Sequence, residues 1–201
     1  MRILIICSGN FMNDKFHIEK LRDEIIIRLK TVKGKTAADI GADTGFISEG
    51  LINAGLKVIA FDPLPSAVNF LQDKFRDIAE FEAVLTSPET IDINDESFDY
   101  AFAYLYLQRS EIPENQVKEI FRILKHGGKA AVIEIMQGES SEHVTGNNDI
   151  PHGFPLPDIY AWFINAGFQD ISIEKTDQLI IYSDSSGAEV RADIFIAYGE
   201  K

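Results

Sequence analysis

Short apolar runs alternate with amphipathic segments through most of this chain. The apolar runs predict buried strands at residues 36–41, 57–61, 81–85, 98–105 and 129–136, and the segments with helical spacing predict helices at 16–30, 45–54, 66–75 and 114–124. Strands that are apolar throughout and separated by helices are typical of a parallel sheet covered on both faces. The pattern therefore predicts an α/β fold.

The pattern changes after Met136. Residues 137–157 are polar and rich in Gly, Ser, Asn and Pro, and so long a connection is typical of a functional lid or a disordered segment. A helix is expected next at 158–166, followed by strands at 168–175, 178–183 and 190–198. A turn at 184–187 precedes the last strand. We expect a Rossmann-like, seven-stranded, mostly parallel sheet that ends in a C-terminal antiparallel hairpin.

Length and charge narrow the class of protein. The 201 residues fit one domain over 1–201, with 1–14 as an N-terminal extension whose apolar run is either an edge strand or a poorly ordered end. The net charge of −13 argues against nucleic-acid binding and against an anionic membrane surface. The single cysteine, Cys7, forms no intramolecular disulfide, and no apolar run has the length of a membrane span. We expect a cytoplasmic monomer or homodimer.

The stretch from Thr36 to Phe46 combines an apolar strand, a turn with two glycines and the start of a helix. Such a turn lets a ligand approach bare backbone and points helix N–H groups at it. Gly41 and Gly45 are two of the three glycines of a dinucleotide fingerprint, and no Gly-Lys-Ser/Thr follows, which excludes a P-loop. An ordinary strand-to-helix turn is the alternative, but Asp39 at the strand end can bind an ammonium group.

A second acid follows at the tip of the next strand. Asp62 lies roughly twenty residues beyond the glycine turn, the spacing at which a carboxylate binds both ribose hydroxyls of a nucleotide. A helix-capping role before Pro63 is the alternative. Together with the glycine turn, the position favours ribose binding.

Five segments, in order, resemble class I S-adenosylmethionine-dependent methyltransferases. Residues 39–45 resemble motif I of that family, and Asp62 matches its ribose-binding motif. Residues 95–99 resemble the segment that leads into the fourth strand, 124–128 the Leu-Lys-Pro-Gly-Gly turn before the fifth, and 165–168 the Ala-Gly-Phe turn before the sixth. The motifs are most similar to the methyltransferase-11 group, which includes ubiquinone/menaquinone-biosynthesis and arsenite methyltransferase relatives.

The resemblance implies that the chain binds S-adenosylmethionine and transfers its methyl group to a small-molecule acceptor. Asp39 and the Gly41 backbone would face the methionine part of the cofactor, and Asp62 would hold the ribose. Loop residues would cover the adenine, and the residues that end the fourth strand would line the sulfonium. The implied cofactor-binding set is Phe16, Asp39, Gly41, Asp43, Gly45, Asp62, Pro63, Ser87, Pro88, Ala103 and Tyr104.

Two positions depart from the family pattern. Asp43 replaces a glycine common in motif I, and it could reach the amino group of the cofactor or crowd it. Gln108-Arg109 stands where relatives often carry histidines, so no base is inherited there. An acceptor that is already nucleophilic, such as an amine, a thiol or a stabilised carbanion, fits that absence.

Candidates for catalysis are few. Tyr104 and Tyr106 could stack near the cationic sulfur or simply pack in the core. His152 could be a base or an exposed loop residue, and Glu134 could meet substrate or form a buried hydrogen bond.

Other functions remain as alternatives. The set His143, Asp149 and His152 fits no metal-ligand signature, and we expect no metal site. Cys7 and His126 are interpreted as structural residues. A module that binds the cofactor or S-adenosylhomocysteine without turnover is the main alternative to an enzyme. A nicotinamide-dependent oxidoreductase is disfavoured because the third glycine is missing.

Overall fold

The computed structural model describes the backbone of residues 3–6, 11–138, 153–183 and 189–201, and the side chains of 19–138, 153–177 and 192–201. Strands and helices alternate through the described residues, as the sequence predicts. In chain order they are β1 (Ile3–Ile6), α1 (Phe11–Arg28), β2 (Thr36–Ile40), α2 (Phe46–Asn53), β3 (Lys57–Asp62), α3 (Pro65–Lys74), β4 (Phe81–Leu85), β5 (Phe98–Tyr104), the short 3-10 helix η1 (Leu107–Arg109), α4 (Pro113–Ile123), β6 (Leu124–Ile135), α5 (Leu156–Ala166), β7 (Gln169–Ser183) and β8 (Glu189–Glu200).

One mixed sheet runs through the molecule in the order β1-β7-β8-β6-β5-β2-β3-β4. The strands from β6 to β4 pair in parallel, and β8 pairs antiparallel with both β6 and β7. This confirms the α/β class and the antiparallel C-terminal hairpin. The described part of the sheet has eight strands instead of seven, because Ile3–Ile6 forms the edge strand that was one of the two alternatives for the N-terminal run and pairs antiparallel with residues 179–182 of β7.

A second difference lies in β7 itself. The sequence predicts two strands, 168–175 and 178–183, whereas the structure has one strand with a shift in register between Lys175 and Leu179. An irregularity of this kind interrupts the alternation of side chains without ending the strand. The pattern therefore mimics a break between two strands.

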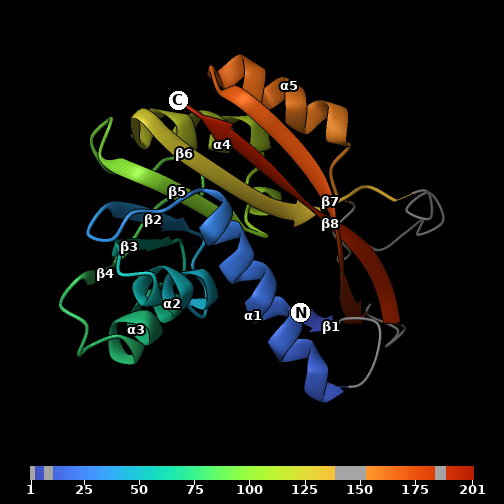
Figure 1. Cartoon of the computed structure of the whole chain (residues 1–201), viewed down its shortest axis with the longest axis horizontal. Helices are drawn as coiled ribbons and strands as arrows, with labels where there is room; N and C mark the ends of the chain where they lie inside the picture. Colours follow the sequence, from blue (N-terminus) through green and yellow to red (C-terminus); the bar gives the residue numbers. More distant parts are fainter. Residues whose placement is uncertain (1–2, 7–10, 139–152, 184–188) are drawn as a thin grey trace.

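The helices cover both faces of the sheet. Helices α1, α2 and α3 lie on one face, and α4 and α5 lie on the other (Figure 1). Strand β5 shows why: Tyr100 and Phe102 belong to the core with α1 and α2, while Ala101 and Ala103 belong to the core with α4 and α5. All four side chains are buried. A strand that is apolar on both faces needs cover on both, and the helices supply it.

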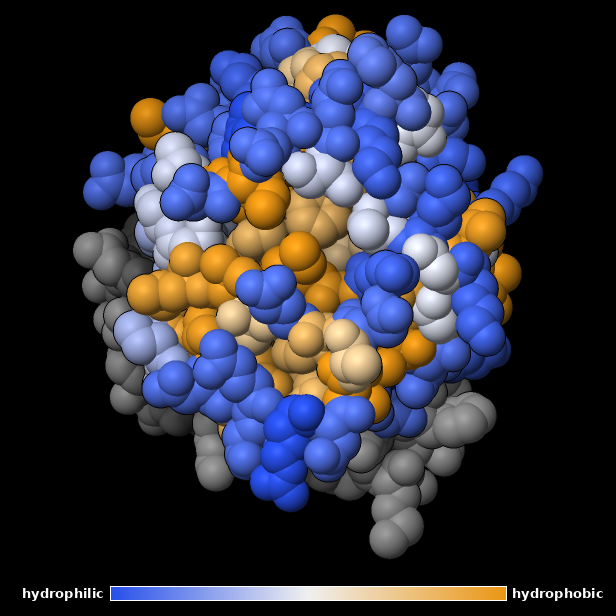
Figure 2. Space-filling model, turned by 90° about the vertical axis from the view of Figure 1, so that its left-hand side faces the viewer, coloured by the Kyte–Doolittle hydropathy of each residue, from blue (hydrophilic) through white to orange (hydrophobic). Residues whose placement is uncertain are grey.

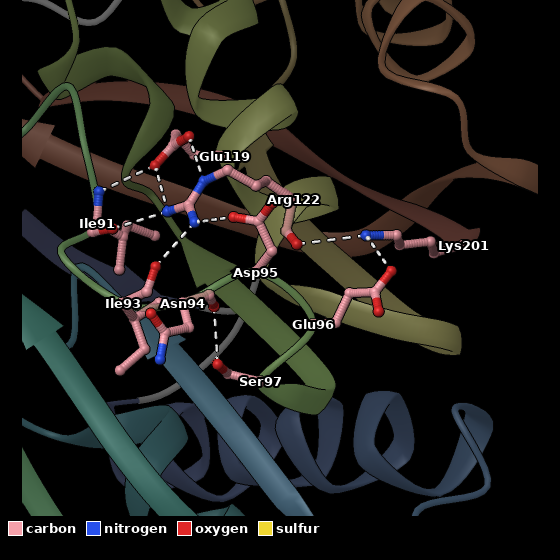
Figure 3. A network of polar contacts seen from close by, with 9 residues as sticks. All are labelled: Ile91, Ile93, Asn94, Asp95, Glu96, Ser97, Glu119, Arg122 and Lys201. Carbon is pink, nitrogen blue, oxygen red and sulfur yellow. Dashed lines mark hydrogen bonds and ion pairs between the residues drawn. The ribbon is translucent and has the colours of Figure 1, made fainter.

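The connection between β4 and β5 contains no helix, and side chains from α4 fix it (Figure 3). The guanidinium of Arg122 donates hydrogen bonds to the carbonyls of Ile91 and Ile93, each at 2.8 Å, and to Asp95 Oδ1 at 2.7 Å. It also contacts Glu119, whose carboxylate accepts the Ile91 N–H at 3.1 Å. Side chains of α4 thus supply hydrogen-bond partners for backbone groups that a helix would pair within itself.

Two of the motifs used for the family resemblance meet at the amino ends of the strands. The carboxylate of Asp99 on β5 accepts the Thr36 N–H at 3.0 Å, the Thr36 hydroxyl at 2.8 Å and the Lys125 ammonium at 3.0 Å. Asp99 thereby joins the starts of β2, β5 and β6. These motifs serve the sheet, not the candidate site.

The face on the left in Figure 1, where the parallel strands begin, contains a hollow lined by apolar side chains between polar rims (Figure 2). The parallel strands end on the opposite side of the molecule. This apolar surface therefore lies away from the edge where ligands bind in folds of this class.

Candidate active site

The carboxyl ends of the parallel strands bring the predicted site residues to one edge. Ile40 at the end of β2 lies opposite Phe61 on β3 and Ala103 on β5, and Tyr104 lies opposite Ile133 on β6. From β2 the chain builds outward to β3 and β4, then returns to β5 on the other side of β2. In open α/β sheets, ligands bind at such a reversal of strand order.

The glycine turn has the backbone that its sequence predicts. Gly41 has φ +74° and Gly45 has φ +76°, values that glycine adopts without strain. Asp43 is also left-handed, with φ +46°. This explains why a glycine suits the position in relatives, and aspartate is among the residues that tolerate it. The Asp43 side chain is exposed, and its backbone makes the contact described next.

Asp62 joins the glycine turn to the start of α3. Its carboxylate is fully buried; Oδ2 accepts the Asp43 N–H at 2.9 Å, and Oδ1 accepts the Leu64 N–H at 2.9 Å. The bond to Leu64 closes a turn before α3, whose N-cap is Leu64 and not Asp62, so the helix-capping role that the sequence left open is wrong. The bond to Asp43 fixes the same carboxylate beside the glycine turn. Ribose binding by Asp62 stays a prediction.

Asp39 is tied inward. Its Oδ2 accepts the Ser48 N–H at 2.8 Å and the Ser48 hydroxyl at 2.6 Å, so it fixes the first turn of α2 against β2. Burial raises the pKa of Asp39 to about 6, and the hydrogen bonds from Ser48 act in the opposite direction. These contacts give Asp39 a supporting role under the glycine turn; a direct contact with the methionine part of the cofactor stays a prediction.

Two tyrosines fill the space beside the turn. A Cβ built on Gly41 would lie 2.1 Å from Tyr106 Cδ2, so this ring packs directly on the Gly41 backbone. Tyr104 packs against Phe46, with ring centroids 5.5 Å apart. Both hydroxyls are buried and have no hydrogen-bond partner among the described residues. Burial raises the pKa of Tyr106 to about 12, and burial followed by the nearby Glu134 raises that of Tyr104 further.

Glu134 lies at the end of β6 and is fully buried. Its Oε1 accepts the Leu107 N–H at 2.6 Å, while its Oε2 has no partner in the described part of the chain. Burial raises its pKa to about 8, against the effect of the backbone N–H groups of Leu107, Ile135 and Tyr106. Of the two roles that the sequence left open, the structure shows the buried hydrogen bond.

The remaining predicted residues surround this edge or fall outside the description. Ser87 is exposed, and its hydroxyl accepts the Glu89 N–H at 3.1 Å, while Pro63 and Pro88 are partly buried in the connections after β3 and β4. Ala103 is fully buried beneath the edge. Phe16 lies in α1 with its side chain outside the described residues, and Cys7, His143, Asp149 and His152 also fall outside them.

The described residues bear on the metal and membrane predictions. No cluster there has three or more side chains suited to holding a metal ion. None of the helices described is both long and apolar enough to cross a membrane. His126 is exposed in the turn before the main part of β6, with its Nε2 3.2 Å from a Glu96 carboxylate oxygen. Cytoplasmic location and the monomeric or dimeric state stay predictions.

Sequence reasoning missed two contacts at the edge. Arg109 on η1 brings its Nη1 to 3.7 Å from Asp62 Oδ2, although the two residues follow different strands. Ser48 holds Asp39, as described above. The signal for Ser48 was a hydroxyl in the first turn of the helix after a strand-end acid. For Arg109 the only signal was its departure from the histidines of relatives.

Comparison with known proteins agrees with this geometry. The methyltransferase domain family matches residues 38–132. An uncharacterised methyltransferase of Mycobacterium tuberculosis is 28% identical over 113 residues, which are 55% of this chain and 44% of that protein. The chain thus spans less than half the length of this relative.

Solved structures share the fold. The [4+2]-cyclase SpnF superposes with a TM-score of 0.78 at 16% identity, covering 98% of this chain and 86% of that one. A SAM-dependent methyltransferase of Methanosarcina mazei gives 0.70 at 19% identity, covering 88% and 96%. Over residues 38–132 this chain matches the methyltransferase domain family, it is similar to a curated methyltransferase, and it shares the fold of a solved SAM-dependent methyltransferase.

Proposed function

We propose that this chain transfers the methyl group of S-adenosylmethionine to a small-molecule acceptor. The observation that carries the proposal is the left-handed glycine turn at the reversal of strand order, with the buried carboxylate of Asp62 fixed beside it. Strand-end carboxylates at this spacing suit vicinal hydroxyls, and the turn leaves backbone accessible to a ligand.

The residues present fit this cofactor. Two backbone N–H groups orient the Asp62 carboxylate, so little reorganisation is needed when ribose hydroxyls replace Arg109 beside it. The Tyr104 hydroxyl is buried at the same edge without a partner in the described residues. A polar ligand atom there would satisfy it.

Bound S-adenosylmethionine supplies an electrophilic methyl group on a positively charged sulfur. The chain itself would hold the ribose through Asp62 and exclude water with the rings of Tyr104 and Tyr106. Aromatic faces and the acidic net charge both suit a cationic ligand. Positioning and water exclusion are the main needs of an in-line methyl transfer, and an amine, thiol or stabilised carbanion brings its own nucleophile.

The proposal is tested by label transfer. Wild type is incubated with S-adenosylmethionine tritiated in the methyl group and a panel of small amines, thiols and carbon acids. We expect label in at least one acceptor, and at least a tenfold slower transfer by Asp62→Asn. Asp73→Asn, which changes an exposed acid on α3, is the matched control. A wild type that binds the cofactor but labels no acceptor would contradict the proposal.

A second candidate function is cofactor binding without methyl transfer. The superposition with a protein named as a [4+2]-cyclase favours keeping it, because that name describes a different reaction on the same fold. The label experiment separates the two: binding with no labelled acceptor favours this candidate, and a labelled acceptor excludes it.

A further inference from the structure

The turn between β5 and η1 is strained. Leu105 has φ +52°, a conformation that a bulky non-glycine residue rarely adopts. Its N–H still donates to the Ile133 carbonyl at 2.9 Å, so pairing with β6 continues up to the point of strain. Such a conformation persists only where the surroundings hold it.

Glu134 supplies that hold from the neighbouring strand. Its carboxyl oxygen accepts the Leu107 N–H at 2.6 Å, two residues beyond the strained position. The side chain is fully buried, and the backbone N–H of Tyr106 also acts on it. Burying a carboxyl group costs free energy unless hydrogen bonds compensate for the lost water. The hydrogen bond to Leu107 supplies part of that compensation.

The held turn carries the two residues that contact the cofactor site. Tyr106 packs on the Gly41 backbone, and Arg109 reaches Asp62. The Arg109 N–H donates to the Tyr106 carbonyl at 2.9 Å, so the two residues belong to one hydrogen-bonded unit. The position of this unit relative to the glycine turn therefore depends on the anchor behind it.

We propose that Glu134 is a positioning residue, which fixes the turn at Leu107 and thereby sets where Tyr106 and Arg109 lie over the cofactor site. The effect on cofactor affinity rests on the proposed function, whereas the anchoring of the turn does not. Because the pKa of Glu134 is about 8, the group is mostly a neutral acid at pH 7. Glutamine, also neutral and with the same carbonyl acceptor, should replace it.

The test compares Glu134→Gln with Glu134→Met, which keeps the length of the side chain but removes the acceptor. Amide hydrogen exchange of Leu107 is measured in the ligand-free protein. We expect Glu134→Gln to match wild type and Glu134→Met to exchange about tenfold faster at Leu107, with exchange at Ala38 in β2 unchanged. Gln116→Met is the control, since Gln116 is buried and its amide atoms have no partner in the described residues.

Affinity for S-adenosylhomocysteine is the second measurement. We expect Glu134→Met to bind about tenfold more weakly than wild type, and Glu134→Gln to restore binding. A purely structural role would lower the unfolding free energy of Glu134→Met and leave the affinity of the folded protein unchanged; that result would overturn the proposal. Equal Leu107 exchange in all variants would overturn it too. If wild type bound no S-adenosylhomocysteine, the proposed function would fail, and the exchange data would still decide the anchoring.

Discussion

Gly41 offers the sharpest test of how the site is built. The residue has φ +74°, and a Cβ added to it would lie 2.1, 2.6 and 2.9 Å from three atoms of the Tyr106 side chain. Gly41→Ala therefore adds two costs: a left-handed alanine and a clash with a buried ring. The Gly34→Ala variant carries only the first of these two costs, because Gly34 has φ +83° but no atom within 4 Å of its built Cβ.

The magnitudes follow from these contacts. The left-handed conformation costs an alanine about 1 kcal/mol, and forcing a methyl group into a filled core costs about 1–3 kcal/mol more. We expect Gly41→Ala to lower the unfolding free energy by about 2–4 kcal/mol, and Gly34→Ala by about 1 kcal/mol. The Gly41→Ala/Tyr106→Ala double variant removes the clash and should show a favourable coupling of about 1–3 kcal/mol.

Urea denaturation of wild type, Gly41→Ala, Gly34→Ala, Tyr106→Ala and the double variant measures these differences. Equal losses for Gly41→Ala and Gly34→Ala would refute the close packing of Tyr106 on the turn. An additive double variant would refute it independently, because residues out of contact do not couple.

Two further predictions concern stability. Arg122→Ala removes the donors for Ile91, Ile93 and Glu119, and we expect a loss of about 2–4 kcal/mol in urea denaturation; Arg76→Ala, an exposed control, should lose less than about 0.5 kcal/mol. A small loss for Arg122→Ala would show that the network does not hold the β4–β5 connection. Glu134 keeps its proton in the folded state up to about pH 8 but loses it near 4.5 when unfolded, so its contribution to stability falls as pH rises between these values. Relative to Glu134→Gln, wild type should lose about 3 kcal/mol between pH 4.5 and 7, and parallel pH profiles would contradict this.

Much of the fold was predictable because its signals are local. Apolar runs and helical spacing located the parallel strands and their helices, and the glycines and Asp62 marked the edge that holds the candidate site. The apolar run that forms β1 was left open between an edge strand and a poorly ordered end, because its partner in β7 lies more than 170 residues away and no local pattern shows that pairing. The same holds for Arg109 beside Asp62 and Tyr106 on Gly41, because each pair joins the ends of different strands.

The structure gives Asp43 and Asp39 contacts that differ from those the sequence predicts. Asp43 stood out as an acid in place of a glycine, and the structure explains the position through its left-handed backbone. The described contact of Asp43 with Asp62 is made by its N–H. In titration calorimetry the Asp43→Gly variant should therefore retain cofactor affinity, and a loss of affinity would show that the Asp43 side chain binds the ligand. Asp39 was expected to face the cofactor, and its carboxylate accepts hydrogen bonds from the N–H and the hydroxyl of Ser48.

The glycine turn and Asp62 form the proposed site for S-adenosylmethionine. Titration calorimetry of S-adenosylhomocysteine into wild type, Asp62→Asn and Asp73→Asn measures whether a ligand of this class binds there. We predict one site per chain in wild type and Asp73→Asn, with at least a tenfold loss of affinity in Asp62→Asn, because a charged acceptor of two hydroxyl hydrogen bonds is removed. Absence of binding to wild type, or equal affinities in all three proteins, would contradict the proposed site at the glycine turn and Asp62.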